Sequence, residues 1–231
     1  MRIDTVIFDL DGTLLDTLDD LTAAVNHALI SFSLPIITRE QARRFVGDGV
    51  KKLMERAVCF ASTGTIDLDG NDFDKSLVSA CLALFTEYYD KHSTDLTAPY
   101  NGVSEMLSAV KDCGLKSAIV TNKYHGAARE LKEIFFPTVD VIVGLKDGIR
   151  PKPSPDGVNA ALALLNSDKS RAVYVGDGET DMKTARACGM PVVAVTWGFR
   201  DESVLMQFNP DFVINKPSEL LDALRGGDLI E

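Results

Sequence analysis

The hydrophobic positions of the chain follow two patterns in two regions. A short apolar run at Thr5–Phe8 predicts a buried strand, and similar runs return after residue 96. The later runs predict strands that alternate with helices, at residues 116–120, 139–143, 172–175, 191–195 and 212–214. This alternation predicts a parallel sheet with helices on both faces, because runs such as VIV and VVAV suit strands that are buried on both sides.

Between these regions the apolar positions recur at helical spacing. Four helical segments are predicted within residues 17–32, 38–45, 50–57 and 76–89, with a polar loop at residues 64–74. Thr17 with Asp20, and Thr38 with Gln41, have the spacing of capping boxes. The sequence therefore predicts an α/β class fold, in which residues 1–15 and 96–231 form a Rossmann-like core. An all-helical domain of residues 16–95 is inserted into this core.

Composition restricts the classes of function. The 231 residues carry a formal net charge of −10, which argues against a nucleic-acid partner, because phosphate backbones require clustered lysine and arginine. The four cysteines form no CxxC pair, and we expect free thiols in a reducing compartment. The N-terminus does not resemble a signal peptide and no apolar run has the length of a membrane span. We therefore expect a cytoplasmic protein with no membrane partner; the sequence makes no prediction of oligomeric state.

Polar side chains follow several predicted strands at the point where each strand ends. They are Asp9 and Asp11 after the first strand, Thr121 and Asn122 after the second, Lys152 before the helix that Ser154 and Pro155 are expected to open, and Asp177 and Asp181 after the strand at 172–175. Each feature alone is an ordinary turn, helix cap or surface lysine. In an open α/β sheet, however, the ligand crevice lies beyond the C-terminal strand ends, so all of these side chains are expected at one edge.

The predicted group suits phosphate chemistry. Asp9, Asp11 and Asp177 offer hard oxygen ligands of the kind that Mg²⁺ prefers. Lys152, with Thr121 and Asn122, could hold the oxygens of a phosphate. A carboxylate can then attack phosphorus in line, and a second carboxyl two residues later can transfer the proton to the leaving oxygen.

These motifs resemble those of the haloacid dehalogenase superfamily. The DxDGT motif matches residues 9–13, the Thr/Ser motif matches Thr121, the lysine motif matches Lys152, and the GDxxxD motif matches residues 176–181. All four motifs occur in the expected order, and the resemblance extends over essentially the whole chain. It implies the superfamily's α/β core and identifies the helical insertion with its cap domain, which closes over the site and excludes water.

The resemblance also implies roles for the individual residues. Asp9 would be the nucleophile that forms an aspartyl-phosphate, and Asp11 the acid/base. Mg²⁺ would be held by the Asp9 carboxylate, the Asp11 main-chain carbonyl and Asp177, while Asp181 would orient the metal site without touching the ion. The phosphoryl group would be bound by three side chains: Thr121, Asn122 and Lys152.

Within the superfamily, the cap segment 45–57 resembles that of phosphoglycolate phosphatases. The expected substrate is therefore a small phosphorylated molecule, with 2-phosphoglycolate preferred. Relatives that cleave carbon–halogen or carbon–phosphorus bonds lack the second aspartate, which is present here as Asp11. A sugar-phosphate mutase resembling β-phosphoglucomutase, a pyrophosphatase and a nucleotidase stay open as alternatives. A non-enzymatic binding module is disfavoured, because none of the motif residues is lost.

Overall fold

The chain of the computed structural model divides at two points, after residue 16 and after residue 98. One compact unit comprises Met1–Asp16 and Pro99–Glu231, and the other comprises Thr17–Ala98. The sequence-based boundaries differ from these by one and three residues. The structure describes residues 2–69 and 73–230, so residues 70–72 of the predicted loop at 64–74 lie outside the described residues.

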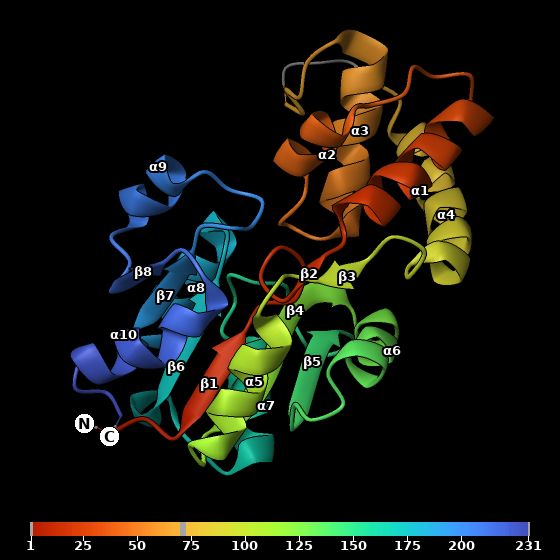
Figure 1. The fold of residues 1–231 in the computed structure, drawn as a ribbon. Coiled ribbons are helices and arrows are strands. Elements are labelled where there is room, and N and C mark those ends of the chain that lie inside the picture. The colour runs from red at the N-terminus through yellow and green to blue at the C-terminus, as the bar shows by residue number, and fades with distance from the viewer. Residues whose placement is uncertain (1, 70–72, 231) are drawn as a thin grey trace. The chain divides into compact units, whose positions relative to one another are not determined.

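The first unit is built on a six-stranded sheet with strand order β5-β4-β1-β6-β7-β8. All neighbouring strands pair in parallel, which confirms the predicted fold class. The strands are β1 (Thr5–Phe8), β4 (Lys116–Tyr124), β5 (Val141–Leu145), β6 (Ala172–Gly176), β7 (Val192–Val195) and β8 (Phe212–Ile214). The chain adds β4 and β5 on one side of β1 and the later strands on the other (Figure 1). The strand order therefore reverses at β1, where a ligand crevice is expected.

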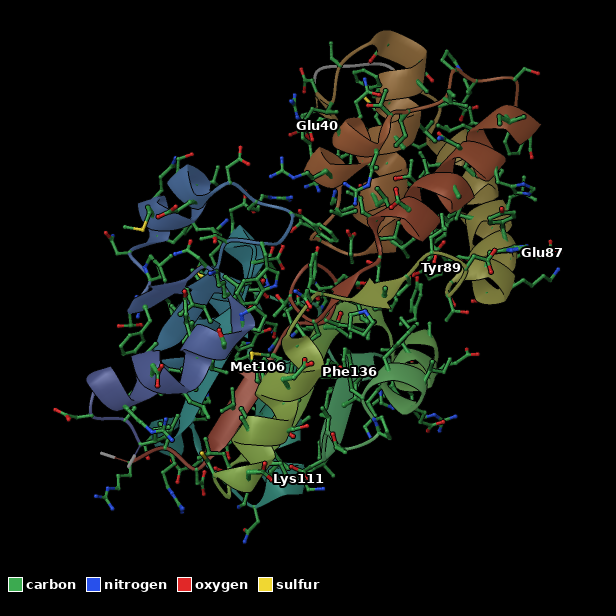
Figure 2. All side chains as sticks on the ribbon, viewed as in Figure 1. Glu40, Glu87, Tyr89, Met106, Lys111 and Phe136 are labelled. Atoms are coloured by element: carbon green, nitrogen blue, oxygen red, sulfur yellow. The ribbon has the colours of Figure 1, made fainter. Side chains whose placement is uncertain are left out.

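Helices cover both faces of this sheet. On one face α5 (Val103–Asp112), α6 (His125–Phe135) and α10 (Leu220–Gly226) pack on Val6 and Phe8 of β1. Met106 and Phe136, labelled in Figure 2, belong to this cluster. On the other face α7 (Asp156–Leu165), α8 (Glu179–Cys188) and α9 (Glu202–Leu205) pack on Ile7. Successive residues of β1 thus enter opposite cores, which explains why the strand has no polar face.

The second unit is helical. Its helices are α1 (Leu18–Ser31), α2 (Arg39–Phe45), α3 (Val50–Thr63) and α4 (Lys75–His92). Two short strands, β2 (Leu15–Asp16) and β3 (Ala98–Pro99), pair where the chain leaves and rejoins the sheet-containing unit. None of the helices in the described residues is both long and apolar enough to cross a membrane.

The two predicted capping boxes differ in outcome. The box at α2 is confirmed, because the Thr38 hydroxyl accepts from the Gln41 main-chain N–H (3.2 Å) and Gln41 accepts from that of Thr38 (2.7 Å). The box at Thr17 and Asp20 is wrong. The Asp20 carboxylate instead accepts from the main-chain N–H groups of residues 96 and 97, at 2.8–3.1 Å. Asp20 therefore fixes the segment after α4 and is not available to the first turn of α1.

Several other predicted boundaries also differ from the structure; for example, the strand predicted at residues 139–143 is observed at Val141–Leu145. The strand predicted to end at residue 120 continues to Tyr124, across a register shift in its pairing with β5. The helix expected to open with Ser154 as cap and Pro155 as first residue begins one residue later, at Asp156. Ser154 still contributes, since its hydroxyl accepts from the Asp156 N–H at 3.4 Å.

A matched pair of substitutions tests this reading of the helix caps. Thr38→Val removes the hydroxyl that caps α2 and should lower the free energy of unfolding by about 1 kcal/mol. Thr17→Val makes the same chemical change at a buried hydroxyl that has no hydrogen-bond partner among the described residues. It should leave stability unchanged or raise it, because no bond is lost and a polar group is no longer buried. Urea unfolding of both variants measures the difference, and a larger loss for Thr17→Val would contradict this assignment.

Candidate active site

Three carboxylates meet at the C-terminal edge of the sheet, next to β1. One oxygen of each of Asp9, Asp177 and Asp181 lies within 4.8 Å of the others. Asp9 directly follows β1, Asp177 directly follows β6, and Asp181 lies in the first turn of α8. Asp177 and Asp181 are buried, and the Asp9 side chain is 14% exposed. The strand-end argument therefore places these three side chains correctly at one edge.

The ammonium group of Lys152 lies inside this group of carboxylates. Its Nζ atom is 2.8 Å from an oxygen of Asp9 and 2.8 Å from an oxygen of Asp181, and it also donates to the Tyr174 hydroxyl at 3.2 Å. Lys152 comes from the segment between β5 and α7, so a different loop supplies the positive charge. The ion pairs of this buried ammonium with Asp9 and Asp181 connect the loop before α7 to the loop after β1 and to the first turn of α8.

Burial and mutual repulsion shift the pKa values of the group. Burial, followed by the Asp181 carboxylate, raises the pKa of Asp9 well above its usual range, although Lys152 opposes this shift. Burial and Asp181 raise the pKa of Asp177 to about 7, against hydrogen bonds from Phe199 and Thr13. Burial alone would lower the pKa of Lys152, but Asp181 and Asp9 outweigh it and hold that pKa well above its ordinary value. The Lys152 ammonium is therefore charged, whereas burial and the Asp181 carboxylate disfavour the ionised forms of Asp9 and Asp177.

The cluster of carboxylates has the chemistry of a site for a divalent cation. The donors are carboxylate oxygens, which are the ligands that hard cations such as Mg²⁺ prefer. Burial and then the Asp181 carboxylate raise the pKa values of Asp9 and Asp177, and a cation beside them would favour their ionised forms. Asp181 is committed to protein partners, because it accepts from Lys152, from Tyr174 and from the Gly178 main-chain N–H. These hydrogen bonds suit a residue that orients the neighbouring side chains of the site and does not itself bind the cation.

Asp11 does not belong to the cluster of three carboxylates, and its side chain has a different partner. Its two carboxylate oxygens lie 2.9 and 3.2 Å from Nζ of Lys123, near the end of β4. The Asp11 side chain is 21% exposed, whereas that of Lys123 is 8% exposed. The carboxyl group of Asp11 is therefore accessible while the lysine that contacts it is largely buried.

The two polar residues of the second motif contact the chain around them. The Asn122 amide accepts from the Lys152 main-chain N–H (2.7 Å) and donates to the Lys152 carbonyl (3.3 Å). Asn122 thus holds the main chain of the residue whose ammonium enters the site. The Thr121 side chain is buried at the same edge, and its hydroxyl accepts from the Lys123 main-chain N–H at 3.2 Å.

Glycines allow the loops to approach Asp177. Gly12 has a φ of +90°, and a Cβ atom there would lie 2.3 Å from a carboxylate oxygen of Asp177. A Cβ atom at Gly198 would lie 2.3 Å from the Cβ of Asp177 and 2.4 Å from the Gly12 carbonyl oxygen. The Asp177 carboxylate is held between these loops, since it accepts from the Thr13 hydroxyl (2.9 Å) and from the Phe199 main-chain N–H (2.8 Å).

Sequence reasoning missed several residues of the site. The segment that follows β7 contributes the Phe199 contact, and Trp197 donates from its indole to the Thr13 carbonyl at 3.0 Å. The strand-end rule could have found this segment, because β7 ends at the same edge as β1 and β6. Lys123 comes two residues after Thr121 of the second motif, but the sequence alone assigned it no role. Tyr174 had no sequence signal, because it lies within an apolar strand.

Comparison with known proteins identifies the family. The family model of the haloacid dehalogenase-like hydrolases matches residues 6–195. The chain is 36% identical over 212 residues to the phosphoglycolate phosphatase of Mesorhizobium japonicum, with 91% of this chain and 89% of the relative covered. The chain therefore belongs to the haloacid dehalogenase-like hydrolase family, which confirms the predicted membership.

One further relative carries a different name, and one solved structure has the same fold over nearly the full length of this chain. The pyrophosphatase PpaX of Listeria monocytogenes is 31% identical, with 97% of each chain covered. A solved structure of a candidate phosphoglycolate phosphatase from Lactobacillus delbrueckii subsp. bulgaricus superposes with a TM-score of 0.90 at 32% identity. That match covers 97% of this chain and 99% of the other.

A glycine substitution tests how closely the loops must approach at Asp177. Gly198→Ala places a methyl group where Asp177 and the Gly12 carbonyl already lie, so it should lower the free energy of unfolding by about 1–3 kcal/mol. Gly126→Ala is the matched control, because no described atom lies within 4 Å of a Cβ atom there. The control should be neutral or slightly stabilising, as expected in a helix. Equal unfolding midpoints for the two variants would show that the site tolerates a wider spacing.

Proposed function

We propose that the protein hydrolyses a small phosphate monoester in a Mg²⁺-dependent reaction that passes through an aspartyl-phosphate at Asp9. The observation that carries the proposal is the position of the Lys152 ammonium, 2.8 Å from both Asp9 and Asp181 beside Asp177. A buried cationic group next to a crowded carboxylate provides a nucleophile and a binding point for phosphate oxygens in one place. Family membership supports the same class of reaction.

In the first half of the reaction, the Asp9 carboxylate attacks phosphorus in line with the ester bond. An O–P bond to Asp9 forms, the ester P–O bond breaks, and its electron pair leaves with the ester oxygen. Asp11 gives its proton to that oxygen, which allows a poor leaving group to depart. Lys152 neutralises charge on the transferred group, and Thr121 lines the same edge. Asn122 serves this phosphate site by holding the main chain of Lys152.

In the second half, a water molecule attacks the phosphorus of the aspartyl-phosphate. Asp11, now a carboxylate, accepts a proton from that water, and the Asp9 O–P bond breaks. Inorganic phosphate leaves and both aspartates return to their starting states. The two aspartates of the first motif therefore have separate tasks, in agreement with their separate lysine partners.

The residues proposed to hold Mg²⁺ are Asp9 and Asp177 through their carboxylates and Asp11 through its main-chain carbonyl. The bound ion would supply positive charge that keeps Asp9 ionised and offsets the charge of the phosphate. Asp181 is proposed to orient the site without touching the ion, consistent with its three hydrogen-bond donors from the protein.

The proposed substrate is 2-phosphoglycolate, cleaved to glycolate and phosphate. The support is the resemblance of segment 45–57 and the name of the relative from Mesorhizobium japonicum. A second candidate is pyrophosphate, because the relative from Listeria monocytogenes is a pyrophosphatase of nearly the same length. We propose that the helical unit Thr17–Ala98 acts as the cap that excludes water and selects the leaving group.

Replacing the nucleophile tests the proposed mechanism. Asp9→Asn should lower kcat for any phosphate ester by about 10⁴-fold or more, because an amide cannot form the acyl-phosphate. The fold should persist, since the change removes one of three crowded carboxylates. Steady-state kinetics with circular dichroism as a control for folding measure both effects. Wild-type turnover by a folded Asp9→Asn protein would refute the nucleophile assignment.

Removing the metal tests the proposed cofactor. Exhaustive EDTA treatment should abolish turnover, and added Mg²⁺ should restore it. Mg²⁺ should also raise the thermal unfolding midpoint of the apoprotein, because a ligand that binds only the folded state stabilises it. Asp177→Asn should lose this shift, while Asp222→Asn, at an exposed aspartate of α10, should keep it. Full activity in EDTA would contradict the cofactor assignment.

A substrate panel tests the choice of leaving group. We expect kcat/KM for 2-phosphoglycolate to exceed that for sugar phosphates, nucleotides and pyrophosphate by about 10²-fold or more, as selective binding of the leaving group requires. A flat profile would refute the phosphoglycolate assignment, and a maximum at pyrophosphate would favour the second candidate.

A further inference from the structure

Lys123 is a charged residue with a largely covered side chain, 8% exposed, and none of the steps described above uses it. It lies near the end of β4, in the stretch between Val120 and Tyr124 where the pairing with β5 shifts register. Its main-chain N–H donates to the Thr121 hydroxyl at 3.2 Å. A Cβ atom at Gly144 of β5 would lie 2.6 Å from its carbonyl oxygen, so the backbone of β5 lies directly against it. The Lys123 backbone is therefore fixed from two sides.

The Lys123 side chain leads from this fixed backbone to Asp11. Its Nζ atom contacts both oxygens of the Asp11 carboxylate, at 2.9 and 3.2 Å. Within the part of the chain that the structure describes, it is the one side chain that hydrogen-bonds this carboxylate. Asp11 and Lys123 lie 112 residues apart in sequence, so the contact joins the loop after β1 to the neighbouring strand.

We propose that Lys123 is a positioning residue that holds the Asp11 carboxyl group in place for proton transfer. This inference rests on the proposed function. A general acid must lie within hydrogen-bond reach of the oxygen that it protonates, and a displacement of about 1 Å can reduce a rate about 10²-fold. Asp11 is 21% exposed and follows a strand end, so without a partner its side chain would be free to change rotamer. The contacts of the Lys123 ammonium with both carboxylate oxygens restrict the Asp11 side chain to one rotamer.

Each of the two aspartates of the first motif thus has its own lysine partner. Lys152 contacts the proposed nucleophile Asp9, and Lys123 contacts the proposed acid/base Asp11. The roles of the two lysines make different kinetic predictions. A lysine that binds the phosphoryl group affects every phosphate ester alike, whereas a lysine that acts through Asp11 affects only esters whose leaving oxygen needs a proton.

The leaving group of the substrate therefore separates the two roles. We compare kcat/KM for 2-phosphoglycolate, whose alkoxide must be protonated, with kcat/KM for 4-nitrophenyl phosphate, whose phenolate leaves without a proton. This quantity reports the steps up to departure of the leaving group and omits the later attack of water. Lys123→Met should lower it about 10²-fold for the alkyl ester, the size expected for general acid catalysis, and less than about 5-fold for the aryl ester. Lys123→Arg should recover most of the alkyl-ester activity, because a guanidinium also pairs with a carboxylate.

Two controls make the test specific. Lys116→Met is the same change at the opposite end of β4, where the ammonium binds the carbonyls of Leu165 and Asn166, and it should alter neither rate. In an Asp11→Asn background, Lys123→Met should cause no further loss with the alkyl ester, because a residue that acts through Asp11 has no effect once that carboxyl is gone.

The possible results distinguish the role of Lys123 from the proposed function. Equal losses for the two esters, or a full additional loss in the Asp11→Asn background, would overturn the positioning role and indicate direct contact with the phosphoryl group. If the wild-type protein hydrolysed neither ester, the proposed function itself would fail, and the role of Lys123 with it. An alkyl-specific loss that is absent in the Asp11→Asn background and recovered by arginine supports the proposal.

Discussion

The contact of one buried ammonium with two carboxylates determines how this site is assembled. Lys152 lies 2.8 Å from both Asp9 and Asp181, so it joins the loop after β1, the loop before α7 and the first turn of α8. Burial is unfavourable for each of these charges alone, and removal of Lys152 would leave two carboxylates in the interior without a counter-charge. Asn122 of β4 also fixes the position of Lys152, because its side-chain amide forms two hydrogen bonds with the Lys152 main chain.

The position of this contact follows from the topology of the sheet. The strand order reverses at β1, so the loop that carries Asp9 and Asp11 lies between the ends of β4 and β6. The loop after β6 then brings Asp177 to Asp9, and the end of β4 brings Lys123 to Asp11. The two aspartates therefore have different electrostatic surroundings although they are two residues apart. This difference provides a physical basis for the proposed division into nucleophile and acid/base.

Much of this arrangement could be predicted from the sequence, because it depends on local patterns and on one general rule. Apolar runs identified the strands, and the strand-end rule placed Asp9, Lys152, Asp177 and Asp181 together. The parts that failed depend on tertiary contacts. Asp20 has the spacing of a capping residue but binds a main chain 76 residues away, and the pairing of Lys123 with Asp11 joins positions 112 residues apart. No local pattern encodes either contact.

The proposed reaction requires that Asp9 becomes covalently phosphorylated. The most direct measurement is to quench the protein with acid during turnover of a phosphate ester, to reduce it with borohydride and to map the peptides by mass spectrometry. Reduction converts an aspartyl-phosphate to homoserine, so we expect homoserine at position 9, in amounts that depend on the presence of substrate. Homoserine at Asp11 or at another carboxylate, or an unmodified chain during rapid turnover, would contradict it.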